Sequence, residues 1–305
     1  MISNRKLAPI ALALGMAFAS AAQAEAITSF NLKDGAGNTI VANADGLDWN
    51  ERGSGVAIGA GPFSDFTLLP PGAQFDFRYQ ANLAAVSGGT PNAAILGLDT
   101  TSDGIAQSFQ SYEFTIVAKM REVVTSSAVV GGNPTAFFGL AGTNADNKVA
   151  IYYDTARNAN TANGTGFDDG TLIALLTIVG DGTTSQFSTL PGSGTGQGSA
   201  KLSAAKIEAG DFINEAYLDG VQRLLFGMSF ESNLNYPSGT SMTTGFHLGG
   251  GSLFTDYNVA SDDIVFKVDG ASRFTEVPEP GSMVLLGLGM LGLAGAKRRR
   301  NAKKA

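Results

Sequence analysis

The residues with the clearest chemical consequence lie at the C-terminal end of the 305-residue chain. Val277-Pro278-Glu279-Pro280 precedes an apolar run over residues 281–296, and a basic tail that begins Lys297-Arg298-Arg299-Arg300 follows it. Each proline fixes φ and removes a backbone donor, so this segment is expected to be an extended linker that a processing enzyme can reach. The predicted chemistry is therefore processing of the polypeptide at this linker.

The apolar run and the basic tail are expected to position that linker at a membrane. A helix over residues 281–296 would span about 24 Å, slightly less than the ~30 Å hydrocarbon core, and Lys297 can extend its ammonium group to the headgroups. The basic tail resists translocation and stays on the cytoplasmic side. These features predict a single-pass anchor helix with the rest of the chain outside. An ordinary C-terminal anchor that happens to follow Pro-Glu-Pro is the alternative.

The N-terminal end has the pattern of a secretory signal peptide. Arg5 and Lys6 precede an apolar run over residues 7–18, and small residues ending Ala22-Gln23-Ala24 follow. This order of charge, apolar run and A-x-A site predicts a signal peptide over 1–24, which signal peptidase cuts between Ala24 and Glu25. The alternative, a buried helix, explains neither the charge nor the A-x-A site.

The C-terminal segment resembles the sorting signal of PEP-CTERM proteins. The resemblance covers residues 276–305: the Pro-Glu-Pro motif, an apolar helix punctuated by glycine, and an arginine-rich end. It implies that Pro278, Glu279 and Pro280 are recognised by exosortase, a membrane protease-transferase of Gram-negative bacteria that make extracellular polysaccharide. Residues 281–296 would then be a transient inner-membrane anchor and residues 297–304 a cytoplasmic retention signal. The implied destination is the cell surface or the extracellular matrix.

The net charge of the chain between the two terminal segments limits the classes of partner that it can bind. Residues 25–280 hold 12 basic and 27 acidic side chains, a net charge of −15. Nucleic-acid binding depends on Lys and Arg that displace counterions from phosphates, so nucleic acid is not an expected partner. The chain contains no cysteine, so thiol nucleophiles and thiolate metal sites are excluded, and stability must come from core packing, to which bound ions can add.

The body over residues 25–275 is predicted to be all-β. Residues 74–83 alternate Phe75, Phe77, Tyr79, Ala81 and Leu83 on one face with polar side chains on the other, which is typical of a half-buried strand. Residues 112–121 repeat the pattern except at Val117, and the continuously apolar residues 172–179 predict a strand covered on both faces. One-sided strands need a second layer, so we expect an antiparallel, jelly-roll-like β-sandwich.

Turns, loops and weak helical segments complete this expectation. Seven Asp-Gly pairs supply the turn chemistry that tight hairpins require. Residues 158–166 and 192–199 are polar loops, and the second is the best candidate for a split of the body into two domains. Helical patterns occur only at 202–208 and at 216–226, where Gly220 interrupts the pattern.

Catalytic constellations are sparse, and the body is expected to be non-enzymatic. His247 is the only histidine, which rules out a site built on several imidazoles, and no Gly-x-Ser-x-Gly elbow is present. The adjacent acids Asp168-Asp169 and Asp262-Asp263 point to opposite faces if they lie on strands, so they are poorly placed to act on one bond. No cofactor is expected. Structural calcium is compatible with the many oxygen ligands, but the sequence names no ligand set.

Two observations bear on a polymer ligand. Trp49, the only tryptophan, could stack under a sugar ring, although a core position is the ordinary alternative. Short segments resemble the body of flocculation-associated PEP-CTERM proteins: residues 48–49, 53–56, 61–63, 77–81 and 263–269. This second resemblance implies a surface or matrix protein that aids exopolysaccharide-associated aggregation in flocs and biofilm. The alternative is a secreted polysaccharide-active enzyme or carbohydrate-binding module delivered by the same route.

Overall fold

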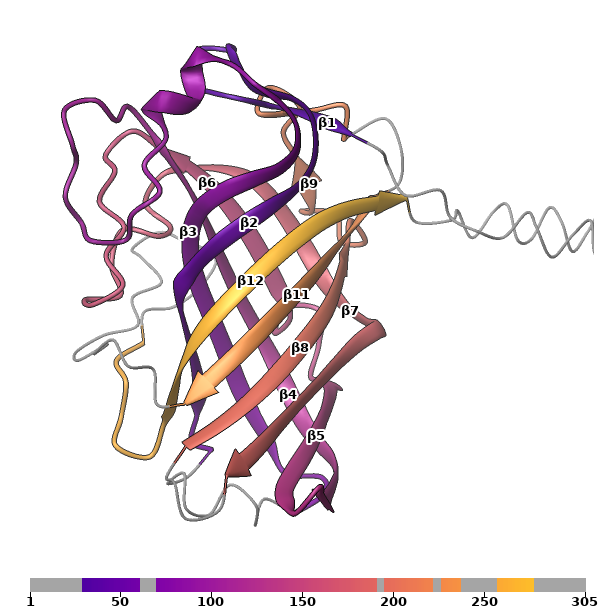
Figure 1. Cartoon of the computed structure of the whole chain (residues 1–305). Helices are drawn as coiled ribbons and strands as arrows, with labels where there is room; N and C mark the ends of the chain where they lie inside the picture. The colour runs from indigo at the N-terminus through magenta and orange to yellow at the C-terminus, as the bar shows by residue number, and fades with distance from the viewer. Residues whose placement is uncertain (1–28, 61–69, 191–194, 222–225, 237–256, 277–305) are drawn as a thin grey trace, which may run out of the picture.

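Figure 1 shows a computed structural model of the chain, which describes residues 29–60, 70–190, 195–221, 226–236 and 257–276. Apart from one 3-10 helix, Ala93–Gly97, the elements described are strands, and all pairings between them are antiparallel. The strands are β1 (Phe30–Lys33), β2 (Thr39–Ile58), β3 (Gln74–Pro91), β4 (Glu113–Val130), β5 (Asn133–Ala141), β6 (Lys148–Asp154), β7 (Thr171–Leu190), β8 (Thr195–Ala205), β9 (Phe212–Ile213), β10 (Leu218–Asp219), β11 (Phe226–Tyr236) and β12 (Ile264–Glu276). The predicted all-β, antiparallel body is confirmed.

The strands form one sheet whose hydrogen-bonded path returns to its starting strand. The path runs from β2 through β12, β11, β8, β7, β5 and β4 to β3, and β3 pairs with β2 again. Long tilted strands make up both walls in Figure 1, and the walls face each other around one interior as the layers of a sandwich do. The closed path leaves β2 and β3 without a free edge along their paired lengths.

Alternating side chains place the apolar residues of each strand inside. Phe75, Phe77, Tyr79, Ala81 and Leu83 are each at most 7% exposed, as the period of two predicts. Rings from strands that are not paired with each other meet there: the centroid of Phe266 on β12 lies 6.1 Å from that of Phe77 on β3 and 5.1 Å from that of Phe187 on β7. One continuous core therefore links strands from both ends of the chain.

The outer face of β3 and β4 is also covered, which the sequence did not predict. Arg78, Gln80 and Asn82 belong to the polar face of β3, yet they are at most 6% exposed. A second apolar cluster lies on this side: Val56, Val117, Ala150, Tyr152, Ala159, Phe167 and Leu175. This cluster explains why Val117 breaks the alternation of β4. Val117 is apolar at a position where a polar side chain was expected, and it is fully buried in the cluster. Loops 99–111 and 155–170 provide much of this cover through bonds such as that from Asn82 Nδ2 to the Thr101 carbonyl, 2.8 Å.

Other local expectations have mixed outcomes. Residues 173–178 are buried on both faces of β7 as predicted, with Leu176 at 1% exposure in the core and Leu175 at 6% in the second cluster, while Leu172 and Val179 at the ends are half-buried. The helix expected at 202–208 is wrong, because residues up to Ala205 lie in β8, which pairs with β7 on one side and β11 on the other. In the described part of the segment 216–226 the regular structure is the short β10 and the first residue of β11, so no helix forms there. Residues 195–199 of the suggested domain split lie within β8.

Trp49 lies in the core. Its side chain is 1% exposed, and its indole N–H donates to Ser272 Oγ at 3.0 Å across the β2–β12 pair. The proposed sugar-stacking role for Trp49 is therefore wrong, and the core alternative is correct.

Replacing Trp49 tests this placement. We expect Trp49→Ala to lower the free energy of unfolding by about 3–5 kcal/mol, because it leaves a large cavity. Denaturant unfolding followed by circular dichroism measures the effect. Val129→Ala, at a position 72% exposed, is the control and should change stability by less than about 0.5 kcal/mol. Equal effects of the two substitutions would contradict a core position for Trp49.

Candidate functional site

The two ends of the described body lie together. Phe30, at the start of β1, packs edge-on against Phe274, near the end of β12, with ring centroids 5.2 Å apart. β12 pairs with β2 only as far as Ser272, and its last residues pair with β11 alone. Figure 1 shows both ends at the same end of the sheet. Any segment attached to the N-terminus and any segment attached to the C-terminus must leave the body from this one pole.

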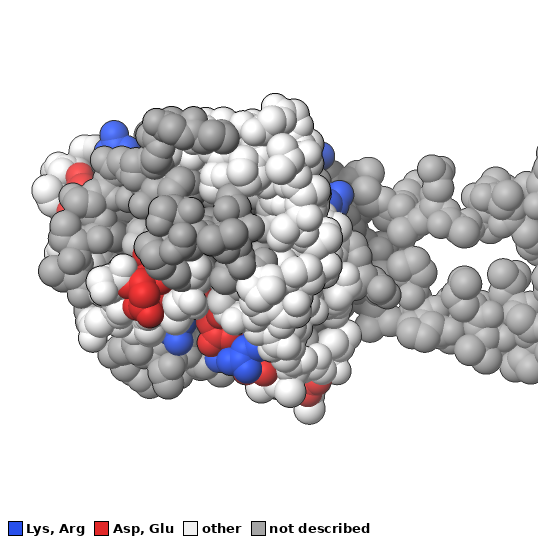
Figure 2. Space-filling view, turned by 90° about the horizontal axis from the view of Figure 1, so that it is seen from below, with Lys and Arg blue, Asp and Glu red and all other residues white. Residues whose placement is uncertain are grey.

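The opposite pole presents little charge. The β4–β5 hairpin turns there, and its tip exposes Val129 and Val130 at 72% and 51%. In Figure 2, most of the described surface seen from this side is neither acidic nor basic, and several acidic and basic side chains stand next to each other. The net charge of the body is therefore not concentrated into one acidic patch on this face.

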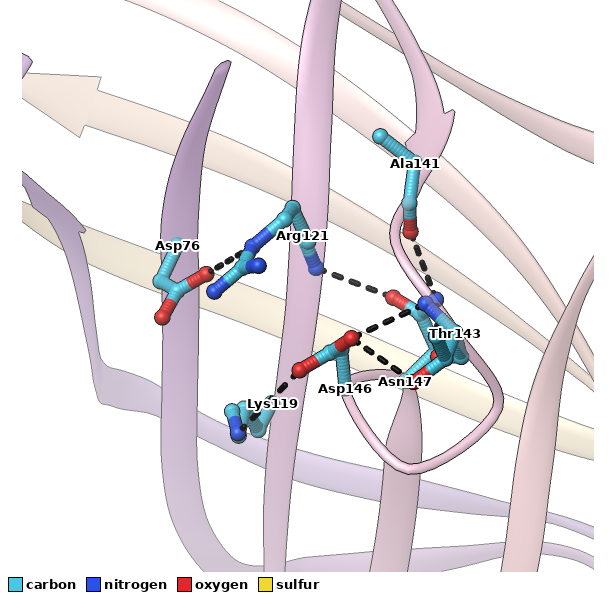
Figure 3. Close-up of polar contacts among 7 residues, drawn as sticks. All are labelled: Asp76, Lys119, Arg121, Ala141, Thr143, Asp146 and Asn147. Carbon is cyan, nitrogen blue, oxygen red and sulfur yellow. Dashed lines mark hydrogen bonds and ion pairs between the residues drawn. The ribbon is translucent and has the colours of Figure 1, made fainter.

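One group of charged side chains holds the loop between β5 and β6 against β4 (Figure 3). Arg121 on β4 pairs with Asp76 on β3, with Nε and Oδ1 2.8 Å apart, and Lys119 Nζ lies 3.9 Å from Asp146 Oδ1. Asp146 also accepts the Thr143 N–H and hydroxyl at 2.9 and 2.8 Å, and these bonds, with the two cations, hold its pKa below the usual range.

The same loop is fixed by Asn147. Its side-chain oxygen accepts the Arg121 N–H at 2.9 Å, and its Nδ2 donates to the carbonyls of Ala141 and Thr143. Because the charges in Figure 3 are matched and the polar groups are bonded, this cluster is structural and offers no vacant position for a ligand.

A groove on the outer face of the sheet is the candidate binding site. It has a volume of about 630 Å³, and the described residues that line it lie on β2, β12, β8, β7 and β5. Its lining combines polar and apolar surface in similar amounts and includes Asp48, Phe137, Thr184, Gln186, Lys201 and Asp269. The strand register places Gln186 opposite Ser199, and their Nε2 and Oγ atoms are 3.5 Å apart. Phe137 from β5 adds a half-buried aromatic ring at the edge.

Two carboxylates lie on neighbouring strands of this groove. Asp48 on β2 is paired with Ala271 on β12, so Asp269 is its diagonal neighbour on the same outer face. Partial burial and the charge of Asp269 raise the pKa of Asp48 above its ordinary value. Polar hydrogen-bonding groups, two acids and one aromatic edge make the groove suitable for a hydroxyl-rich ligand.

The acids singled out from the sequence have structural roles or lie apart from the groove. Asp263 accepts the Gly59 and Ala260 N–H groups and the Tyr257 hydroxyl at 2.7–2.8 Å, while Asp262 is exposed. Asp168 is 7% exposed and Asp169 binds Asn158 Nδ2 at 2.9 Å. Within the described residues, no group of three or more His, Cys, Asp or Glu side chains is arranged to hold a metal ion. His247 lies outside the described residues.

The sorting residues also lie outside the described part of the chain. These are Val277, Pro278, Glu279 and Pro280, the tail Lys297, Arg298, Arg299 and Arg300, and the predicted cleavage pair Ala24 and Glu25. The predicted signal peptide and anchor helix fall there too and remain predictions. Among the described residues, no helix has the length and apolarity needed to span a membrane.

Comparison with known proteins identifies the C-terminal segment. Residues 276–300 match the family model of the PEP-CTERM protein-sorting motif. The chain is thus an exported protein of the PEP-CTERM class, which exosortase sorts. Glu276, the first matched residue, is also the last residue of β12, so the motif follows the folded body without a spacer. Neither the curated proteins nor the solved structures contain a match to this chain.

A buried acid inside the body, Glu122, was missed in the sequence. It is 5% exposed and borders a cavity of about 20 Å³ lined by Phe77, Phe138 and Phe187 among others. Burial raises its pKa from the ordinary 4.5 to about 7, against the lowering effect of a hydrogen bond with Ser185. The only available signal was one acid among the inward-facing positions of β4.

Glu122 is expected to make stability depend on pH. Because its folded-state pKa is raised, its stabilising contribution is complete below about pH 4.5 and is lost as the pH rises through about 7. Between pH 5 and pH 8 the wild type should therefore lose more free energy of unfolding than Glu122→Gln, which cannot ionise. Denaturant unfolding at both values measures this difference. Glu51→Gln, at an exposed position, should behave as the wild type; an identical pH dependence in Glu122→Gln would refute the assignment.

Proposed function

We propose that the exported body is a non-enzymatic component of the cell surface or extracellular matrix, which contributes to exopolysaccharide-associated aggregation. The observation that carries this proposal is the PEP-CTERM motif joined directly to β12, because it assigns the folded body to the exosortase route. The resemblance of short body segments to flocculation-associated PEP-CTERM proteins supports the aggregation role. Signal peptidase and exosortase are the maturation partners in this proposal, and exopolysaccharide is the ligand.

The outer groove supports a polymer as that ligand. An open groove with several polar side chains can contact the hydroxyl groups of a sugar polymer, and the ring of Phe137 can pack against an apolar sugar face. The acidic body has little attraction for polyanions such as nucleic acid.

The pair of carboxylates in the groove favours a second candidate, a polysaccharide-active enzyme. Glycosidases use two carboxyl groups about 5–10 Å apart, and the diagonal arrangement of Asp48 and Asp269 is of this kind. Asp48, however, is exposed to water, whereas a general acid usually depends on an enclosed, weakly polar surrounding. This exposure is the reason for preferring binding over catalysis.

Sorting and aggregation can be tested together in a deletion strain that carries the full-length gene. The wild-type chain should restore aggregation under polysaccharide-producing conditions. Replacement of Pro278, Glu279 and Pro280 by alanine should abolish that rescue and leave unprocessed precursor in the inner membrane, because exosortase no longer recognises the chain. Cell fractionation and the mass of the C-terminal peptide are the measurements.

The control for this test is Val129→Ala with Val130→Ala, at the pole opposite the chain ends. This variant should be processed normally. If the wild-type chain is processed but deletion leaves aggregation unchanged, the aggregation role is wrong while the sorting assignment stands.

The groove can be tested with mature protein and the extracellular polysaccharide of the producing cells. Phe137→Ala should weaken binding by about 3- to 10-fold, since one aromatic contact contributes roughly 1 kcal/mol. Phe109→Ala, at a position 70% exposed in loop 99–111, is the matched control and should bind as the wild type. Appearance of new reducing ends that Asp48→Asn and Asp269→Asn abolish would instead establish the enzymatic alternative.

A further inference from the structure

Two acids, one fully buried and one half-buried, lie where β4, β6 and loop 155–159 meet. Glu113, the first residue of β4, is fully buried, and the strand register places it directly opposite Asp154, the last residue of β6. Directly opposed side chains on one face have Cβ atoms about 5 Å apart, and like charges in such positions repel each other. This arrangement is costly unless something neutralises it.

Each carboxylate uses one oxygen to hold the loop. Glu113 Oε1 accepts the N–H groups of Asn158 and Ala159 at 2.8 and 3.2 Å, and Asp154 Oδ1 accepts the N–H of Ala156 at 2.9 Å. The second oxygens, Glu113 Oε2 and Asp154 Oδ2, are buried and have no hydrogen-bond partner, and the same holds for Asn158 Oδ1. Three oxygen acceptors are thus buried and unpartnered on three residues that are linked by register and by hydrogen bonds.

The surroundings provide no compensating positive charge. Burial raises the pKa of Glu113 to about 8, and the charges of Asp99 and Asp154 add to this effect, while the two loop N–H groups oppose it. Neither Glu113 nor Asp154 takes part in an ion pair with another described residue. The guanidinium of Arg157 is instead bonded to the carbonyls of Gln107 and Gln110.

We propose that Glu113 and Asp154 bind one hard divalent cation such as Ca²⁺, with the side-chain oxygen of Asn158 as a third ligand. Carboxylate and amide oxygens are the ligands that Ca²⁺ prefers, and water completes its flexible coordination sphere. The ion would use the oxygens that lack partners and cancel the repulsion across the strand pair. Because all three ligands are tied to loop 155–159, the ion would also fix this loop on the outer face of the sheet.

The ligands of this site would carry less negative charge than those of most structural calcium sites. It offers two carboxylates, in keeping with the lack of any three-acid cluster among the described residues. The competing solution is a proton on Glu113, which would remove the charge without an ion. The two solutions differ in whether stability depends on Ca²⁺.

The test uses mature wild-type protein and two variants, Glu113→Gln and Asp154→Asn, each stripped with EDTA and titrated with Ca²⁺. We expect calorimetric binding of one Ca²⁺ and a rise of the thermal midpoint with Ca²⁺ concentration in the wild type, since a ligand of the native state stabilises it. Each variant should bind at least tenfold more weakly. Asp48→Asn, in the groove, is the control and should retain wild-type affinity.

The proposal is overturned if the wild type neither binds Ca²⁺ nor changes its midpoint at millimolar Ca²⁺, or if both variants keep wild-type affinity. A wild type whose thermal midpoint is indifferent to Ca²⁺, together with a Glu113→Gln protein of equal stability, would identify a protonated glutamic acid instead. If Glu113→Gln does not fold, Asp154→Asn decides the matter by calorimetry. None of these results depends on whether the protein binds polysaccharide.

Discussion

The whole body depends on the pairing of β2 with two strands at once. β2 bonds to β3 along one edge and to β12 along the other, and this double pairing closes the sheet. β12 is the last strand of the described part of the chain, so this interior is complete only when residues 264–276 are in place. The packing of Phe266 against both Phe77 and Phe187 shows the consequence, because one side chain of β12 contacts rings on β3 and on β7, two strands with which β12 is not paired.

This closure bears on maturation. The strand that completes the sheet ends at the residue where the sorting motif begins, and Phe274 near that end packs on Phe30 at the start of β1. The predicted signal-peptide cut after Ala24 and processing beyond Glu276 both fall outside the described strands. Removal of either terminal segment therefore costs none of the described strand pairings, and the body can keep its sheet through sorting.

Sequence periodicity predicted which strands form and which side chains face inward, but not what covers their outer faces. Period-two alternation assigned Phe77 and Tyr79 to the core correctly, yet Gln80 and Asn82 were expected in water and are fully buried under loops. Periodicity shows which face of a strand a side chain belongs to. It does not show whether a loop that is distant in the sequence covers that face. Residues 202–208 are rich in good helix formers, but pairing of β8 on both edges overrides that local preference.

The same reasoning explains why neither candidate site could be predicted. The acid pairs visible in the sequence are adjacent residues, and adjacency on a strand or tight loop separates side chains; Asp263 consequently serves as a loop cap. The acids that do come together, Glu113 directly opposite Asp154 and Asp48 diagonal to Asp269, are brought together by strand register alone. In a sheet of long antiparallel strands, register decides which charges must share a surface. The chemistry of such a body therefore lies in pairings that only the fold defines.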